Sequence, residues 1–145
     1  MEDWKANLIE SNAGVLEVVR QTKTIAVLGI KPESRAGEPA FYVPQYMAQH
    51  GCDVIPVPVY YPDVTEILGK PVFRRLAEID RPVDMVNVFR RGDDIPPHVD
   101  DILGVKPKFV WFQLGIRNEE AAETLARAGI KVVQDRCLMV EHGRL

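Results

Sequence analysis

Short apolar runs alternate along this chain with polar segments that carry helix start and stop signals. The runs contain few polar residues, which is typical of strands buried on both faces of a parallel sheet. This pattern predicts strands at residues 24–29, 53–57, 71–73, 83–89, 109–113 and 131–134. Because proline cannot donate a ladder hydrogen bond, Pro56 indicates that the second strand lies at an edge of the sheet or ends there.

The polar segments between these runs predict helices from their capping residues. Pro39 suits the first turn of a helix that Gly51 ends, and Asn118 is a cap for a helix that runs to Gly129. Further helical segments are expected at residues 12–21, 74–78 and 96–103. Strands and helices that alternate through right-handed crossovers predict an α/β fold. We expect a Rossmann-like, doubly wound, mainly parallel sheet of five to six strands with helices on both faces.

The composition is that of one ordinary globular domain. The chain has 145 residues, of which 46% are hydrophobic and 27% charged, and its formal net charge is −3. This charge argues against a protein that binds nucleic acid through bulk positive charge. No apolar run approaches the roughly 20 residues that span a bilayer, so no membrane segment is expected. We therefore expect a single domain over residues 1–145, with residues 1–22 as a helical lead-in.

The cysteines and the first residues indicate a reducing compartment. Cys52 and Cys137 occur without a Cys-x-x-Cys motif or a paired histidine, so neither a zinc site nor a disulfide framework is expected. Residues 1–10 carry acids and no uninterrupted apolar stretch, so we expect no signal peptide. The sequence thus predicts a cytoplasmic protein.

The loop after the first strand has the composition of an anion-binding loop. Gly29, Lys31, Ser34 and Arg35 precede the helix that starts at Pro39, and a helix N-terminus attracts negative charge. The dinucleotide fingerprint G-x-G-x-x-G is absent, because Lys31 and Ser34 stand where its later glycines would fall. Ordinary turn chemistry after a strand is the alternative interpretation.

The loop after the second strand, residues 56–62, contains three prolines and two tyrosines. It lacks the acid that holds the ribose hydroxyls in NAD-binding proteins. Its stiff, apolar composition suits stacking against an adenine ring. A rigid crossover packed on the surface is the alternative.

Two further loops add groups at the same end of the sheet. Arg90 and Arg91 end the fourth strand and can hold phosphate, although ion pairs with Asp93 or Asp94 compete with this interpretation. After the fifth strand, Gly115 allows a ligand to approach the backbone, and a plain strand-to-helix turn is the alternative. Ligands of doubly wound sheets bind at the carboxyl ends of the strands, where all four loops converge.

Seven segments, in order and at compatible spacing, resemble the stand-alone CoA-binding domain proteins. They cover the chain from residue 23 onward: 25–29, 39–43, 51–57, 67–69, 83–90, 110–115 and 135–141. The family is similar in fold to the CoA-binding N-terminal domain of the succinyl-CoA synthetase alpha subunit. Its members are bacterial and archaeal cytoplasmic proteins without an established catalytic activity as a class. The resemblance therefore implies non-catalytic binding of coenzyme A or acyl-CoA.

The resemblance also implies how CoA would lie across the strand ends. The pyrophosphate is expected near Lys31 and the start of the following helix, the adenine and ribose against the second loop, and the pantetheine arm along the third and fourth loops. Arg35 would reach a phosphate, and Arg117 would stand on the same rim. The implied contacts are Gly29, Ile30, Lys31, Arg35, Ala40, Val57, Pro58, Phe89, Arg90, Arg91, Gln113, Gly115 and Ile116.

Two loops depart from the family pattern. The family usually carries a small residue and then a polar one after the first glycine, whereas this chain has Ile30 and a longer loop. After the second strand the family usually has Asn-Pro and a basic residue, where this chain has Pro58, Val59 and Tyr60. Weaker CoA binding or a changed ligand therefore stays open.

No catalytic constellation is evident in the sequence. His50, His98 and His142 are expected at the surface or at helix ends, and Asp84 and Asp135 have no evident partner. Cys137 follows the last strand, where it could form a mixed disulfide with CoA or serve as a buried small hydrophobe.

Two other functions remain as alternatives to CoA binding. One is an NAD(P)-binding domain or small oxidoreductase, which the fold favours generically and the missing fingerprint disfavours. The other is a protein interaction module that has lost its ligand. A homodimer and an acyl-transfer partner protein are both compatible with the sequence.

Overall fold

Five parallel strands form the central sheet of the computed structural model, which describes residues 3–145. Their order across the sheet is β2-β1-β5-β6-β7, and every neighbouring pair is parallel. Their bounds are Thr24–Leu28 (β1), Asp53–Val57 (β2), Met85–Val88 (β5), Phe109–Phe112 (β6) and Lys131–Val133 (β7). The expected α/β class is confirmed, and β2, which contains Pro56, is an edge strand.

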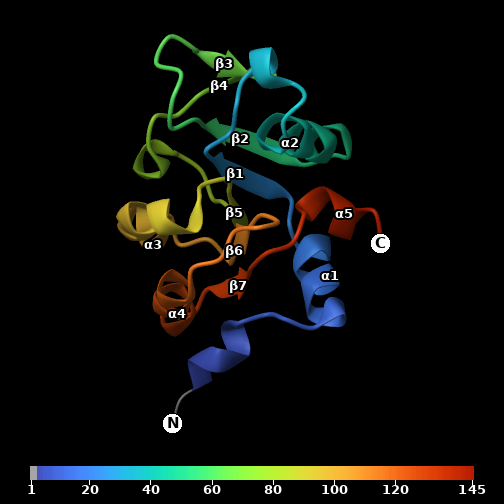
Figure 1. Ribbon diagram of the computed structural model, residues 1–145, viewed down its shortest axis with the longest axis vertical. Helices are drawn as coiled ribbons and strands as arrows, with labels where there is room; N and C mark the ends of the chain where they lie inside the picture. Colours follow the sequence, from blue (N-terminus) through green and yellow to red (C-terminus); the bar gives the residue numbers. More distant parts are fainter. Residues whose placement is uncertain (1–2) are drawn as a thin grey trace.

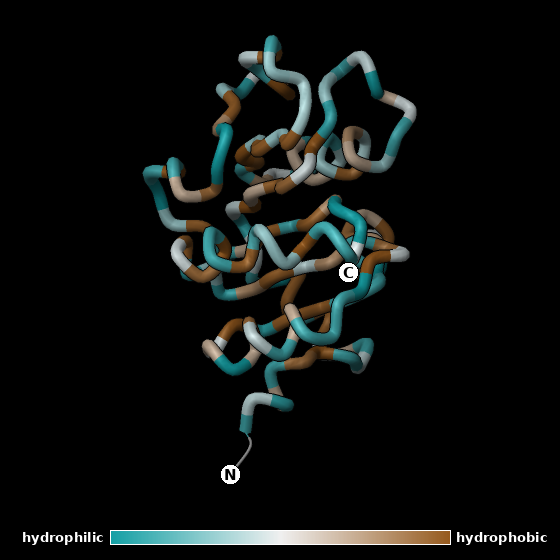
Figure 2. Tube along the Cα trace, turned by 60° about the vertical axis from the view of Figure 1, so that its left-hand side comes forward, coloured by the Kyte–Doolittle hydropathy of each residue, from teal (hydrophilic) through white to brown (hydrophobic). Residues whose placement is uncertain are grey.

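Helices cover both faces of the sheet, which Figure 1 shows nearly edge-on. The bounds are Asn12–Arg20 (α1), Pro39–Gln49 (α2) and Leu138–His142 (α5) on one face, and Val99–Val105 (α3) and Glu119–Arg127 (α4) on the other. Side chains of β1 divide between the two resulting cores: Ile25 and Val27 join the cluster under α1 and α2, and Ala26 and Leu28 join the cluster under α3 and α4. Burial on both faces explains the uninterrupted apolar runs. Figure 2 shows these hydrophobic segments inside and hydrophilic loops outside.

The chain reverses its direction of travel across the sheet between β1 and β5. From β1 it passes through α2 to β2 on one side, and it then returns past β1 to β5 on the other. The loops that follow β1 and β5 therefore start side by side and diverge, which is the switch point where doubly wound sheets bind ligands. Hydrogen bonds hold both loops at the strand ends, from Gly29 N to Val57 O (2.9 Å) and from Phe89 N to Leu28 O (2.8 Å).

The predicted third strand at residues 71–73 is wrong as a member of the main sheet. Residues Glu66–Ile67 (β3) and Lys70–Pro71 (β4) instead form a small antiparallel hairpin. Phe73 N donates to Pro56 O of the edge strand (2.9 Å), but the pairing goes no further. Neither Pro71 nor Pro56 has an N–H to donate, so a continuous ladder with β2 is not available here.

Each predicted helix is found at its expected position, although the residues at which it begins or ends differ. The turn at residues 74–78 is a 3-10 helix at Leu76–Glu78, and the helix expected from residue 96 begins as a 3-10 turn before α3. The Asn118 side chain caps α4 by accepting from Ala121 N (2.9 Å). Helix α5 was not predicted.

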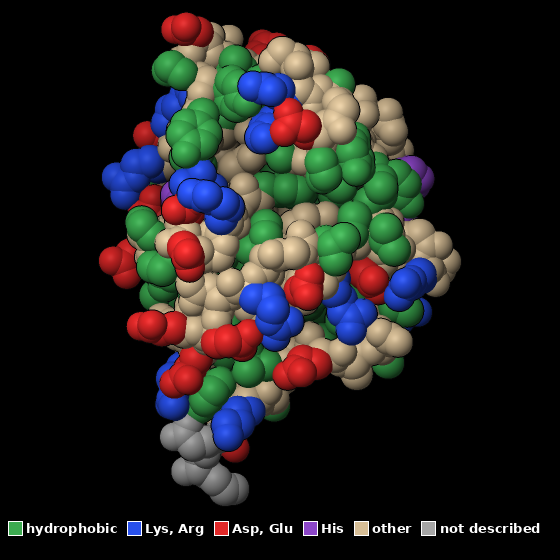
Figure 3. All heavy atoms as spheres, in the orientation of Figure 1, with side chains coloured by type: hydrophobic (Ala, Val, Ile, Leu, Met, Phe, Trp, Pro, Cys, Tyr) green, Lys and Arg blue, Asp and Glu red, His purple; other side chains and the backbone are tan. Residues whose placement is uncertain are grey.

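The lead-in packs along the β7 side of the molecule. A 3-10 helix at Asp3–Asn7 contacts α4, and Leu8 forms a parallel bridge with Val132. The first two residues of the predicted lead-in lie outside the described residues. No helix within residues 3–145 is long and apolar enough to cross a membrane. On the face shown in Figure 3, basic side chains lie among acidic ones rather than in a single basic field.

Candidate functional site

Two adjoining cavities open at the switch point. The first, of about 240 Å³, lies beside the loop after β2 and is called here the tyrosine-side cavity. The second, of about 350 Å³, lies beside the start of α2 and is called the helix-side cavity. Both are lined by Lys31, Phe89, Arg90 and Arg91. One ligand can therefore extend from one cavity into the other past these four side chains.

The loop after β1 passes close to the loop after β5 because residue 29 is a glycine. Gly29 has φ +88°, and a Cβ atom there would lie 2.5 Å from the carbonyl oxygen of Phe89. A side chain at this position would both strain the backbone and push the two loops apart. Gly92 is similarly constrained, since its Cβ would meet the carbonyl oxygen of Arg117.

Arg90 is the cation at the centre of the switch point. Its guanidinium lies 5.5 Å from the ring centroid of Tyr60, within cation–π distance. Its Nε is buried and has no hydrogen-bond partner among the described residues. A buried N–H of this kind costs free energy until an acceptor reaches it, so it points to an anionic or polar ligand.

Arg91 behaves differently from its neighbour. Its side chain is 89% exposed, and its Nε donates to Asp94 Oδ2 at 3.1 Å. The ion pair that competed with phosphate binding is therefore formed at Arg91 and leaves Arg90 as the more available cation.

Buried polar side chains hold the far wall of the helix-side cavity. Gln113 is 4% exposed, and its Oε1 accepts from Asn87 Nδ2 (3.3 Å) and from Leu138 N (3.4 Å). Next to it, Gly115 N donates to Asp135 Oδ1 at 2.7 Å. Asp135, for which the sequence suggested no partner, thus orients this loop. Asp84 lies at the opposite end of the sheet, where its Oδ2 accepts from Lys23 N and Thr24 N.

Most of the site residues expected from the sequence come together here. They line one or both cavities, as follows: Gly29, Ile30, Lys31, Ala40, Phe89, Arg90, Arg91, Gln113, Gly115 and Ile116. Arg35, Val57 and Pro58 line neither cavity. Val57 and Pro58 are buried, because Val57 O still pairs with Gly29 N at the end of β2. Arg35 instead pairs with Glu38 at 3.4 Å.

Several lining residues were missed by the sequence analysis. They are Val59, Tyr60, Tyr61 and Asp94 in the tyrosine-side cavity, and Glu38, Pro39, Gly92 and Leu114 in the helix-side cavity. The proline- and tyrosine-rich loop was predicted to stack on an adenine ring, but its cavity-lining residues lie just after Val57 and Pro58 rather than at them. The two tyrosines, which had suggested adenine stacking, were the sequence signal for this position, and Tyr60 is exposed in the structure.

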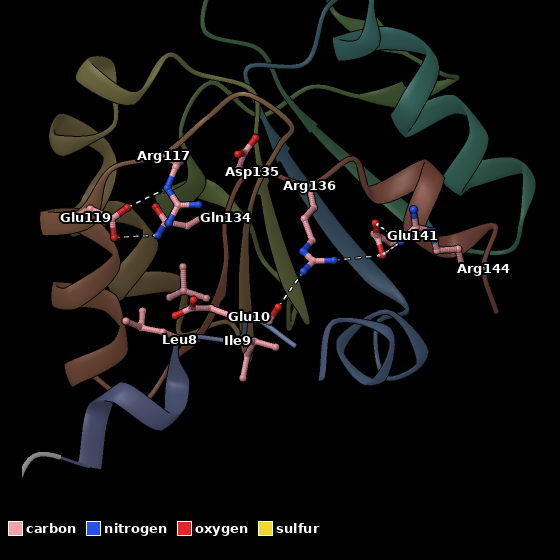
Figure 4. Close-up of a pocket in the computed structure, with 11 residues that line it drawn as sticks. Leu8, Ile9, Glu10, Arg117, Glu119, Gln134, Asp135, Arg136, Glu141 and Arg144 are labelled. Carbon is pink, nitrogen blue, oxygen red and sulfur yellow. Dashed lines mark hydrogen bonds and ion pairs between the residues drawn. The ribbon is translucent and has the colours of Figure 1, made fainter. Parts of the chain in front are cut away.

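A larger cavity of about 420 Å³ lies away from the switch point, along β7 and the lead-in, and we call it the β7-edge cavity (Figure 4). Its arginines bind their neighbours. Arg117 pairs with Glu119 (3.0 Å), Arg136 donates to Glu10 O (2.8 Å), and Arg144 pairs with Glu141 (3.4 Å). Arg117 was expected on the ligand rim, but it belongs to this cavity. Because these cations already have acceptors, the β7-edge cavity is the weaker candidate.

The histidines and Cys137 lie outside both switch-point cavities. His142 Nδ1 is 2.9 Å from the Tyr46 hydroxyl, and His50 stacks on the Tyr46 ring at a centroid distance of 3.9 Å. Cys137 is half-buried and packs against the cluster under α1 and α2. Within residues 3–145 no group of histidine, cysteine and acidic side chains is arranged to hold a metal ion.

The family model described as the CoA binding domain matches residues 23–143 of this chain. The chain belongs to this CoA-binding-domain family. It is 36% identical over 132 residues to the uncharacterized protein YneT of Bacillus subtilis, a match that covers 91% of this chain and 94% of YneT. The motifs that suggested the resemblance are thus confirmed as family membership.

Solved structures agree with the fold. Cell-free ID.343 from Thermus thermophilus is 39% identical, with a TM-score of 0.84 over 93% of this chain and 98% of that one. The dinucleotide-forming acetyl-coenzyme A synthetase 1 of Ca. Korarchaeum cryptofilum, solved with phosphate and ADP, has a TM-score of 0.63. It is 19% identical and covers 81% of this chain and 27% of its own, so it shares the fold alone. These matches favour neither of the alternative functions.

Proposed function

We propose that this protein binds coenzyme A or acyl-CoA, without catalysis, in the two cavities at the switch point. The observation that carries the proposal is Arg90, which lines both cavities and has a buried Nε without a hydrogen-bond partner among the described residues. A ligand phosphate would supply the missing acceptor through a charge-assisted hydrogen bond. Family membership supports CoA as the molecule that brings this phosphate.

The groups around Arg90 suit the different parts of CoA. Lys31 and the N-terminus of α2 can hold the pyrophosphate, because cations and helix N-termini both favour anions. The rings of Tyr60 and Tyr61 offer a stacking surface for the adenine. Gln113 and the backbone around Gly115 can contact the pantetheine amides. In this arrangement the adenine lies against Val59–Tyr61 rather than against Val57 and Pro58.

Non-catalytic binding is supported by the chemistry of the lining residues. Among the described residues that line the two cavities, none carries a serine or threonine hydroxyl, a thiol or an imidazole. The side chains present can orient and neutralise a ligand, but they do not form a nucleophile and base pair. The two free cysteines are consistent with action in the reducing cytoplasm, where a binding protein could serve an acyl-transfer partner or act as a homodimer.

Thermal unfolding with a panel of ligands tests this function. CoA, 3′-dephospho-CoA, NAD and NADP are each added at the same excess. A ligand at 100 times its dissociation constant adds about 2.7 kcal/mol to the free energy of unfolding. For a domain of this size we expect CoA to raise the midpoint by roughly 5–10 °C. We expect a smaller rise with 3′-dephospho-CoA and none with NAD.

Other outcomes of this panel would overturn the proposal. A shift with NAD or NADP alone would assign the cavities to a redox cofactor. If no ligand shifted the midpoint, the protein would not be a nucleotide binder. Acyl-CoA, added at the same excess, then shows by a larger or smaller shift whether the acylated or the free form is preferred.

A further inference from the structure

The carboxylate of Glu38 occupies an anion position at the mouth of the helix-side cavity. Glu38 is the N-cap residue of α2, but its side chain makes no capping hydrogen bond to that helix. Its oxygens instead accept from Lys31 Nζ at 2.5 Å and from Arg35 Nη1 at 3.4 Å. A negative group thus lies between two cations and in front of a helix N-terminus. Cations and a helix N-terminus together form the environment in which a phosphate binds favourably.

The contact with Glu38 makes the Lys31 ammonium unavailable to a ligand. Lys31 lines both switch-point cavities, and Glu38 lines one of them. While Lys31 is bound to Glu38, its charge is neutralised within the protein. Both side chains are only partly covered, at 34% and 38% exposure, so the pair can open without unfolding any element.

We propose that Glu38 is an internal substitute for a ligand phosphate and determines which anions the site accepts. This inference rests on the proposed function and assigns the selecting residue. A phosphate monoester carries about −1.5 to −2 charges at neutral pH, against −1 for the carboxylate. A polyphosphate or phosphate monoester can therefore displace Glu38 and take over Lys31 and Arg35, whereas a singly charged ligand cannot do so efficiently.

The same contact keeps Glu38 charged. The hydrogen bond from Lys31 lowers the pKa of the Glu38 carboxyl, so the group stays ionised at neutral pH. Arg35 gains a role from this arrangement: although it lines neither cavity, it becomes available to a ligand once Glu38 moves away. The expected contribution of Arg35 to phosphate binding is thus indirect.

The test compares Glu38→Gln with the unmodified protein by calorimetric titration with CoA and with inorganic pyrophosphate. The substitution keeps the shape of the side chain but removes its charge, so Lys31 is free for the ligand. We expect both ligands to bind about two- to fivefold more tightly to E38Q, the size of effect seen for partly exposed charges. Glu17→Gln is the matched control, because Glu17 forms a similar exposed ion pair with Arg20 on α1, away from the cavities.

A double variant separates the specific contact from a general change of charge. In a Lys31→Met background, E38Q should improve binding much less, because Lys31, the more closely paired of the two cations that it frees, is gone and only Arg35 remains. If E38Q improves binding equally with and without Lys31, the substitution acts through overall charge, and the inference is wrong. Unchanged or weaker binding by E38Q alone would also overturn it.

The two ligands distinguish this inference from the proposed function. If CoA binds the unmodified protein and E38Q equally well, CoA binding stands and the role of Glu38 falls. If CoA binds neither protein but pyrophosphate binds E38Q more tightly, Glu38 guards an anion site and the CoA assignment falls. If neither ligand binds either protein, both are wrong.

Discussion

The switch-point cavities and the β7-edge cavity are both lined by arginines, but Arg90 at the switch point differs from the arginines of the β7 edge in its hydrogen bonding. At the β7 edge, Arg136 donates to Glu10 O and Asn12 Oδ1, and it is only 24% exposed. At the switch point, Arg90 has a buried Nε without a partner among the described residues. An arginine with its hydrogen bonds satisfied holds segments of the fold together, whereas an unsatisfied one is available to a ligand. Size alone would have selected the β7-edge cavity.

The largest effect on stability and CoA binding is expected where the loop after β1 approaches the loop after β5. Gly29→Ala places a methyl group 2.5 Å from the Phe89 carbonyl oxygen and forces a non-glycine residue to φ +88°. We expect a loss of about 2–4 kcal/mol in the free energy of unfolding, measured by urea denaturation, together with loss of CoA binding.

Gly51→Ala is the matched control for this change. Gly51 has φ +93°, but a Cβ there would meet nothing within 4 Å. Only the backbone strain of about 1 kcal/mol applies, and CoA binding should be retained. Equal losses for G29A and G51A would contradict the importance of the Gly29–Phe89 approach.

The next largest effects are expected on substitution of Arg90 and of Arg136, which compare an arginine available to a ligand with one that holds the fold together. Arg90→Gln should raise the dissociation constant for CoA about 10- to 100-fold, because a hydrogen bond between charged groups is lost. Arg136→Gln should leave CoA affinity unchanged but lower the free energy of unfolding by about 1–2 kcal/mol, since it releases Glu10 and Asn12 from the loop between β7 and α5. Calorimetric titration and urea denaturation measure the two quantities. If the effects were exchanged, the roles assigned to the two cavities would be exchanged as well.

Helix α5 borders the β7-edge cavity and contacts Gln113 of the helix-side cavity through Leu138 N. A smaller effect is expected from the loss of stability in acid at this helix. Burial and the nearby His50 lower the pKa of His142 below its ordinary value of 6.5. The unfolded chain therefore takes up the proton more readily, so stability is present above that ordinary pKa and falls as the pH decreases through and below it.

His142→Gln tests this sign, because it removes the titrating group at the contact with Tyr46. The midpoint of thermal unfolding should fall less between pH 7 and pH 5 in this variant than in the unmodified protein. Because Leu138 of α5 also binds Gln113, CoA affinity should weaken along with α5 at low pH. A steeper fall in the variant would contradict the assignment.

The smallest effect is expected at the exposed rim of the β7-edge cavity. Arg117 and Glu119 are 53% and 68% exposed, and exposed pairs of this kind contribute little. Arg117→Gln should change the free energy of unfolding by less than about 0.5 kcal/mol and leave CoA binding unchanged. Weakened CoA binding in this variant would support the prediction from the sequence that Arg117 contacts the ligand.

The sequence was sufficient for the sheet because burial on both faces leaves a clear apolar pattern. It placed β1, β2, β5, β6 and β7 and the caps of α4. It failed for the segment at residues 71–73, where a short apolar run resembles a strand but two prolines prevent a ladder. Helix α5 was missed because it is too short for a periodic pattern and its N-cap residue, Cys137, makes no side-chain cap.

The sequence was sufficient to predict the glycines of the candidate site and the loops that form it, but not the ion pairs within it. Which of Arg90 and Arg91 is satisfied depends on where Asp94 lies, and the binding of Arg35 to Glu38 depends on the path of a loop. Such contacts are set by tertiary geometry rather than by spacing along the chain. The same holds for Val57, which the hydrogen bond from Gly29 keeps within the sheet, and for Pro58, which is buried just after the end of β2.

The most direct test of ligand binding at the switch point is to follow backbone amide resonances during titration with CoA. The account predicts that the shifts concentrate in three segments: residues 29–31, 89–92 and 113–116, which line the two cavities. Amides around Glu10 and Arg144, at the β7 edge and away from these segments, should stay unchanged. Shifts centred on the β7 edge, or no shifts with CoA at all, would contradict the account.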